Sequence, residues 1–291
     1  MSKGITATAS VVLVVSILLV AWFVPIERAF PIVMVLLVLF CMMLGIIICK
    51  QPLGILISEQ NVISLSRFQT VLWTVVIISG FLVIAMARIK NGVMAGDDSA
   101  ELGDPLNIVL GKDLLGLLGI TATSLVGSPL ISAIKKNKRP AADAAEKTAK
   151  EMVNLNNVPD SVAKAGAAVA PNASKKFVQH TDEIAAAIER NAEGLLYKNP
   201  TVSDANFTDM FEGNEVGNAA HVDLAKVQMF FFTMAVAIAY VVGLWDIIST
   251  EAIYGANFTF PSVSNGLVGV LGISNFGYLA GKAVDHTSKS V

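Results

Sequence analysis

The chain alternates between mostly apolar stretches and shorter polar segments. Six stretches reach the ~20 residues that an α-helix needs to cross the roughly 30 Å hydrocarbon core of a bilayer. None of them contains Asp, Glu, Lys, Arg or His. This pattern predicts an all-α polytopic membrane protein with about six transmembrane helices, over Ile5–Val24, Pro31–Cys49, Phe68–Ala87, Leu114–Ile134, Val227–Trp245 and Ser262–Gly281. The fourth and sixth stretches are rich in Gly and Ser, so each either crosses fully or is re-entrant.

The composition agrees with this prediction. Of the 291 residues, 54% are hydrophobic and 15% are charged, whereas a soluble globular protein carries about 25% charged residues. The net charge of −2 gives no general argument for nucleic-acid binding. No small-x-small cleavage site follows the first apolar stretch, which is also long for the core of a signal peptide. We therefore expect that stretch to be retained as a helix.

Basic residues are unevenly distributed between the two sets of segments that flank the spans. They concentrate in one set, which holds Lys3, Lys50, Arg67, Lys226, Lys282 and the cluster of residues 135–139. The opposite set has fewer basic residues and is diluted by acids such as Asp104, Asp113 and Asp246. Cytoplasmic flanks of membrane proteins carry the excess of Lys and Arg. Both termini are therefore predicted to be cytoplasmic, and a bacterial inner (plasma) membrane is the expected location.

A short polar motif occurs twice, each time at the start of an apolar stretch. The first copy reads Ser-Leu-Ser-Arg-Phe-Gln over residues 64–69, and the second reads Asp-Leu-Ala-Lys-Val-Gln over residues 223–228. In each copy a Thr follows the Gln by five residues, at Thr74 and Thr233. One span later, each copy leads to Gly-x-x-Gly-Ile followed by Thr or Ser. The sequence therefore predicts an internal parallel repeat of two-helix units.

The repeat divides the chain into five parts. Residues 1–50 are predicted to form an N-terminal transmembrane hairpin that has no counterpart in the repeat. Residues 62–134 and 223–284 are the two repeat units. Between them, residues 135–222 are predicted to form a helical cytoplasmic insert, with one helix starting near Thr181. Residues 285–291 form a C-terminal tail.

Uncharged polar residues in the spans are the main candidates for function. An amide or hydroxyl at membrane depth needs a hydrogen-bond partner, because hydrocarbon offers none. Such residues either tie helices together or line an aqueous path. Both interpretations are open for Gln69, Thr74, Thr121, Ser124, Gln228, Thr233, Ser274 and Asn275.

Two further groups of residues suggest contacts. Small residues let helix backbones approach closely in a membrane, which predicts close packing at Gly116, Gly119, Gly269, Gly272, Gly277 and Gly281. A basic cluster directly after the fourth span is expected to contact anionic lipid. Alternatively, it docks a polyanion such as a nucleotide or oligonucleotide. The cluster consists of Lys135, Lys136, Lys138 and Arg139.

The sequence predicts no catalytic, cofactor or metal site. His180, His221 and His286 all lie outside the spans, and Cys41 and Cys49 lie in one apolar stretch without other metal ligands nearby. No P-loop, zinc-ligand spacing or Gly-x-Ser-x-Gly motif is present. We therefore expect the protein not to be an enzyme.

Three functions fit these observations. The first expectation is a homo-oligomeric channel or pore, gated through the insert by a cytoplasmic protein, nucleotide or oligonucleotide. The alternative is a non-conducting membrane anchor or scaffold that holds a cytoplasmic partner through residues 135–222. The third is a small-solute transporter subunit, which the lack of ionisable residues in the spans makes the weakest of the three.

Overall fold

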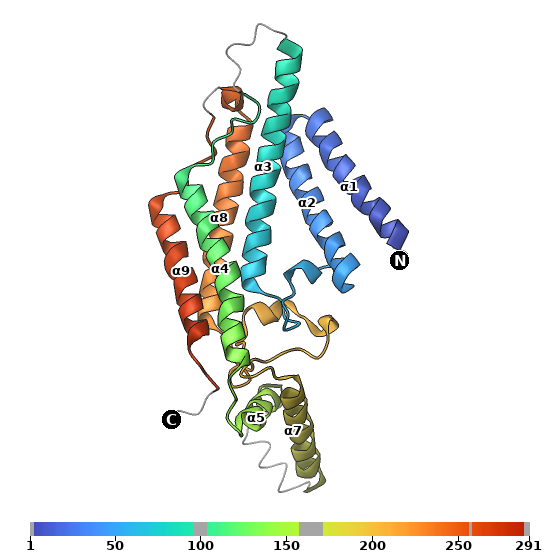
Figure 1. Cartoon of the computed structure of the whole chain (residues 1–291), viewed down its shortest axis with the longest axis vertical. Helices are drawn as coiled ribbons and strands as arrows, with labels where there is room; N and C mark the ends of the chain where they lie inside the picture. The colour runs from blue at the N-terminus through green and yellow to red at the C-terminus, as the bar shows by residue number, and fades with distance from the viewer. Residues whose placement is uncertain (1–2, 96–103, 157–170, 256–257, 288–291) are drawn as a thin grey trace. The chain divides into compact units, whose positions relative to one another are not determined.

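A computed structural model of the chain describes residues 3–95, 104–156, 171–255 and 258–287. In these ranges the chain is helical, with isolated β-bridges and no β-strand. The α-helices are α1 (Lys3–Phe23), α2 (Ile26–Cys49), α3 (Leu65–Ala95), α4 (Lys112–Lys136), α5 (Ala144–Asn156), α7 (Pro171–Asn191), α8 (Leu224–Ile248) and α9 (Asn265–Ala283), labelled in Figure 1. Residues 157–170 of the predicted insert and 288–291 of the predicted tail lie outside the described ranges.

Among the described residues, four helices are long and apolar enough to cross a membrane. They are α2, the Leu65–Gly92 part of α3, α4 and α8, which coincide with the second to fifth predicted spans. The prediction of an all-α fold is therefore confirmed for the described residues, and the length and composition of these four helices are consistent with a membrane protein. The apolar part of α1, Thr8–Phe23, is shorter than these four, and α9 is interrupted by polar residues such as Asn275. The count of six crossings stays a prediction.

The chain divides into two compact units. Unit 1 consists of Met1–Leu56, Leu65–Leu125 and Gln228–Phe276, and unit 2 consists of Ile57–Ser64, Val126–Val227 and Gly277–Val291. The helices α4, α8 and α9 contribute residues to both units.

The core of unit 1 is built from α1, α2, α3, α4, α8 and α9. The first two helices are joined only by Val24 and Pro25, and they pack on each other. Between α3 and α8, the rings of Trp73 and Tyr240 meet edge to face with their centroids 5.8 Å apart. Many apolar side chains remain on the surface of this unit, as expected for helices that contact lipid, among them Val12, Val35, Ile78, Val242 and Ile273.

The segment after α2 folds back onto the helix that it leaves. The helix ends at Cys49 because Lys50 adopts a left-handed conformation, with φ of 61° and its N–H bonded to the carbonyl of Ile46. Two glycines make the return possible. A Cβ on Gly45 would lie 2.7 Å from the carbonyl oxygen of Gln51, and a Cβ on Gly54 would lie 2.7 Å from the carbonyl oxygen of Gly45. Any other residue at either position would push this segment away from α2.

Unit 2 contains a small second core between α5 and α7, which lie side by side in Figure 1. Its buried residues are Ala144, Ala145, Ala149, Ile188 and Val216. The predicted helix start near Thr181 was wrong, because α7 begins at Pro171. Proline is well suited to the first position of a helix. The acidic residues after Thr181 therefore lie exposed in the middle of α7, not in its first turn.

Candidate functional site

Gln69 and Thr233, one from each copy of the repeated motif, are hydrogen bonded to each other inside unit 1. The amide Nε2 of Gln69 in α3 donates to Oγ1 of Thr233 in α8, with 2.5 Å between the two atoms. Both side chains are buried, with 0% and 1% of their surface exposed. This bond ties α3 to α8 within a single chain.

The corresponding residues of the two copies, Thr74 and Gln228, are exposed. The reason is geometric. Five residues advance an α-helix by about 1.4 turns, so a Gln and a Thr at this spacing point in different directions. In the first copy the Gln points inward, and in the second copy the Thr does. The repeat in sequence therefore does not produce two equivalent environments.

A second buried pair links α4 and α9 in unit 1. The hydroxyl of Ser124 donates to Oδ1 of Asn275, and Nδ2 of Asn275 donates to the carbonyl of Leu271 at 2.9 Å. Thr121 is also buried and bonds to the carbonyl of Leu118 at 2.9 Å. Ser274 is buried next to this pair, and among the described residues its hydroxyl has no hydrogen-bond partner.

Only two of the candidate glycines lie against a neighbouring helix in unit 1. A Cβ on Gly116 would lie 3.7 Å from Val268, and one on Gly272 would lie 3.5 Å from Ile120. These are ordinary contact distances, so both glycines lie at the packing surface of α4 and α9. No atom of a described neighbour comes within 4 Å of a Cβ built on the others, which are Gly119, Gly269, Gly277 and Gly281.

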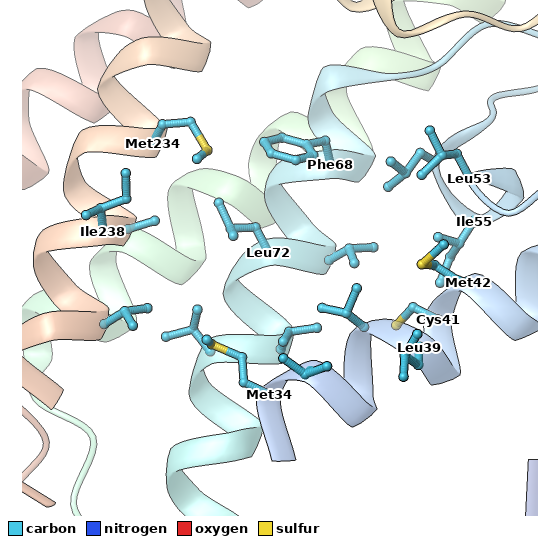
Figure 2. Close-up of a pocket in the computed structure, with 18 of the residues that line it drawn as sticks. Met34, Leu39, Cys41, Met42, Leu53, Ile55, Phe68, Leu72, Met234 and Ile238 are labelled. Atoms are coloured by element: carbon cyan, nitrogen blue, oxygen red, sulfur yellow. The ribbon is translucent and has the colours of Figure 1, made fainter. Parts of the chain in front are cut away.

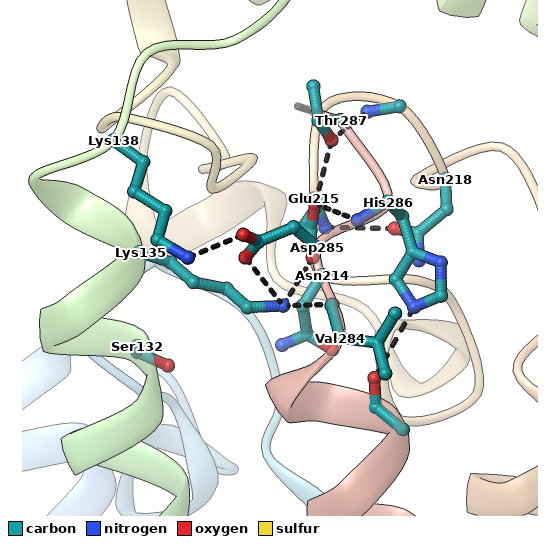
Figure 3. A network of polar contacts seen from close by, with 12 residues as sticks. Ser132, Lys135, Lys138, Asn214, Glu215, Asn218, Val284, Asp285, His286 and Thr287 are labelled. Carbon is teal, nitrogen blue, oxygen red and sulfur yellow. Dashed lines mark hydrogen bonds and ion pairs between the residues drawn. The ribbon is translucent and has the colours of Figure 1, made fainter. Parts of the chain in front are cut away.

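Three of the four basic residues after the fourth span form ion pairs within unit 2. Lys135 is buried and pairs with Glu215, and its ammonium also donates to the carbonyl of Val284 at 2.5 Å. Figure 3 shows this pair beside Lys138, whose ammonium pairs with Asp285. Lys136 pairs with Glu193 at 2.9 Å and with Glu59 at 3.4 Å. Arg139 is exposed.

Glu215 is the centre of the polar network shown in Figure 3. Its Oε2 accepts hydrogen bonds from the backbone N–H of His286 and from the hydroxyl of Thr287, both at 2.8 Å. Its own backbone N–H donates to Oδ1 of Asn218 at 2.9 Å. The carboxylate thus fixes the start of the C-terminal tail to the end of α4. Sequence reasoning did not single out Glu215, because it lies in a loop without a recognisable motif.

The environment in unit 2 shifts the pKa of three groups. Hydrogen bonds from Lys136 and Lys198, each at 2.9 Å, lower the pKa of Glu193. Burial raises the pKa of Asp209, and the backbone N–H groups of Asn206 and Ile63 partly oppose this by bonding to the carboxylate. Burial also raises the pKa of Tyr197. These shifts stem from burial and from hydrogen bonds within unit 2.

Arg88 is the other residue whose role the sequence did not reveal. It is buried near the end of α3 in unit 1, with 1% of its surface exposed. Its guanidinium donates to four backbone carbonyls, those of Ile253, Asp104, Asn107 and Gly255, at 2.6 to 3.0 Å. It also lies 5.6 Å from the ring centroid of Phe258. In the sequence, Arg88 is a basic residue at the end of a span, which is the usual position of a residue that faces water or headgroups.

The described residues contain no cluster of three or more His, Cys, Asp or Glu side chains that could hold a metal ion. The candidate residues therefore form two buried helix-to-helix pairs in unit 1 and an ion-pair network in unit 2. Comparison of the chain with protein-family models, with curated proteins and with solved structures finds no match.

Proposed function

We propose that the protein is a non-conducting membrane anchor that holds a soluble cytoplasmic protein through unit 2. The observation that carries this proposal is the contrast between two exposed surfaces. Unit 1 exposes apolar side chains along candidate membrane spans. The α5–α7 pair instead exposes side chains of both charges, namely Glu146, Lys147, Lys150, Asp182, Glu183, Glu189 and Arg190.

The buried polar pairs support an anchor more than a pore. Gln69 and Asn275 would be the strongest candidates for lining an aqueous path. An amide at membrane depth needs a hydrogen-bond partner, and the water in such a path would supply one. Both are buried and bonded to partners within the same chain. In this arrangement they stabilise helix packing, as polar residues in membrane helices commonly do.

The chemistry of α7 favours a partner with a basic surface. Among the residues of α7 whose side chains the structure describes, Asp182, Glu183 and Glu189 are exposed, and Arg190 is the one exposed cation. Complementary charge between two surfaces raises the association rate and selects partners. A polyanion is a poorer fit for unit 2, because Lys135, Lys136 and Lys138 are already paired with carboxylates.

The test is photo-crosslinking in native membranes. A photoreactive amino acid is placed at Glu189 on α7, and as a matched control at Ile78, an exposed apolar residue of α3. We expect a stoichiometric adduct with a soluble protein from position 189 only. Charge reversal of Asp182 and Glu183 to Lys should remove the adduct, and high salt should weaken it. Equal adducts from both positions, or none from position 189, would argue against the anchor.

We further propose the arrangement of the chain in the membrane. In addition to the four apolar helices, α1 and α9 cross the bilayer, which gives six crossings and places both termini in the cytoplasm of a bacterial inner membrane. The support is the excess of basic residues in one set of flanks. Reporter fusions after Lys50, Lys112 and Lys282 test this topology, because only the second should report the non-cytoplasmic side.

A homo-oligomeric channel is the second candidate. The exposure of Thr74 and Gln228 on α3 and α8 favours it, since polar side chains on an otherwise apolar surface can meet those of other subunits. Any such pathway would lie between subunits. Planar-bilayer recordings of the purified protein decide this, because a channel requires a conductance that Gln228→Ala and Thr74→Val alter, whereas the anchor predicts no conductance.

A further inference from the structure

Unit 1 contains an apolar groove with a volume of about 570 Å³. It is formed by α2, α3, α8 and the 50–56 segment that folds back after α2. Every side chain that lines it is hydrophobic. Figure 2 shows Met34, Cys41, Met42, Phe68, Leu72 and Met234 around this space.

The groove follows the helices along part of their length. On α2 the lining extends from Met34 to Met42, on α3 from Phe68 to Val76, and on α8 from Met234 to Val242. At a rise of 1.5 Å per residue, each of these stretches is about 12 Å long. All three helices are candidate membrane spans. A long apolar groove on such helices is therefore bordered by the hydrocarbon of the bilayer.

The lining indicates what kind of molecule fits. It offers no hydrogen-bonding side chain, so the bound part of the ligand has to be apolar. The volume falls within the roughly 300–1,000 Å³ of typical ligand pockets, and an unfilled void would lose dispersion contacts. Three methionines contribute flexible, polarizable side chains that adapt to a chain of variable shape. An acyl chain meets all these conditions.

A basic residue lies close in the chain to the part of the lining that follows α2. Lys50 precedes the lining residues Pro52 and Leu53 by two and three residues. The Lys50 side chain is exposed, and its ammonium donates to the carbonyl of Ile47 at 3.2 Å. An ammonium has three donors, and basic residues at membrane borders attract anionic headgroups.

We propose that this groove is a binding site for an anionic phospholipid, with one acyl chain between α2, α3 and α8 and its phosphate at Lys50. The inference requires membrane integration, but it does not depend on the proposed cytoplasmic partner. The lipid would fill the surface between these helices and stabilise the tight return of the chain at Gly45 and Gly54.

Native mass spectrometry of the full-length protein in mild detergent tests the site. The wild type should retain a phospholipid. Val71→Trp fills the groove and should lower the fraction of protein that retains a phospholipid by at least about fourfold. This is the change expected when a single methylene group of the acyl chain is excluded from the groove. Ile78→Trp, an exposed control on the same helix, should have no effect. Lys50→Asn, which suits the left-handed conformation, should remove the preference for anionic over zwitterionic headgroups.

Cys41 gives a second readout that does not depend on the folding of Val71→Trp. In a Cys49→Ala variant it is the one remaining cysteine of the chain. Adding anionic phospholipid to delipidated protein should slow the alkylation of Cys41 by an apolar maleimide. Unchanged alkylation would overturn the proposal, as would equal lipid retention by Val71→Trp and Ile78→Trp. A lipid-free dimer that Val71→Trp dissociates would show instead that a second copy fills the groove.

Discussion

Replacing Glu215 with Gln removes the charge that pairs with Lys135 while keeping the shape of the side chain. Both side chains are almost completely buried, at 2% and 3% exposure. After the substitution, the ammonium of Lys135 keeps its bond to the carbonyl of Val284 and its longer ion pair with Asp285, at 4.0 Å, but loses its close carboxylate partner. The hydrogen bonds that His286 and Thr287 of the tail donate to this side chain would then be accepted by a neutral amide.

The burial of this ion pair sets the expected loss in the free energy of unfolding. Removing one partner of a buried ion pair typically destabilises a protein by 3–5 kcal/mol, because a charge is left without compensation. Since Gln retains an acceptor oxygen, we expect a loss near the lower end, about 3 kcal/mol. Lys135→Met should cost a similar amount. The double variant should lose less than the sum, with a coupling energy of about 1–3 kcal/mol.

The assay is denaturant unfolding of the full-length protein in detergent, followed by circular dichroism, with carboxypeptidase digestion as a measure of tail release. The matched control is the pair of Glu146 and Lys150 on α5, whose side chains are 55% and 57% exposed. Breaking that pair should cost no more than about 0.5 kcal/mol. A Glu215→Gln variant that is as stable as the control variant, with a tail as resistant to carboxypeptidase as that of the wild type, would contradict a structural role of the buried pair.

Three other predictions follow from the site. Gln69→Leu should destabilise unit 1 by about 0.6–2 kcal/mol in a thermal unfolding assay in detergent, whereas Thr74→Val, at an exposed position, should have no effect. Arg88→Lys should cost about 2–4 kcal/mol in the same assay, because an ammonium cannot reach four carbonyls with the geometry of a guanidinium; a variant as stable as the wild type would contradict the proposed role of Arg88. The ion pairs of Glu193 lower the pKa of its carboxyl group. They therefore stabilise the folded protein at pH values above the pKa of a Glu in the unfolded chain, about 4.3. This stabilisation is lost as the pH falls through the lowered pKa of the folded state. Glu193→Gln should flatten that part of a pH–stability profile by less than about 1 kcal/mol, since the pairs are partly exposed.

The long apolar helices were predictable from the sequence because the bilayer sets a simple length requirement. The second to fifth spans needed only a run of about 20 apolar residues without charge. The same criterion is weak where glycine and polar residues interrupt the run, as they do in α9. It also does not reveal which polar residue faces which helix, so the bond between Gln69 and Thr233 appeared only in the structure.

Charge patterns were less informative about contacts. Lys135, Lys136 and Lys138 follow a span, and such positions usually contact headgroups or solvent. Their partners, Glu215, Glu193 and Asp285, are distant in sequence, so no local pattern indicates the pairs. The contacts of Arg88 were not predictable either, because its acceptors are backbone carbonyls, which every residue carries.

The central claim is that the two buried polar pairs of the membrane helices, Gln69 with Thr233 and Ser124 with Asn275, hold helices together and do not line water. Labelling of substituted cysteines in native membranes tests it, with Cys41 and Cys49 first replaced by Ala. Ser124→Cys and Thr233→Cys place near-isosteric thiols at the two buried pairs, and Glu189→Cys on α7 serves as the exposed control. We expect a charged, membrane-impermeant thiol reagent to react rapidly at position 189 and not at positions 124 and 233. Rapid reaction at either buried position would show an aqueous path through the helices and contradict the central claim.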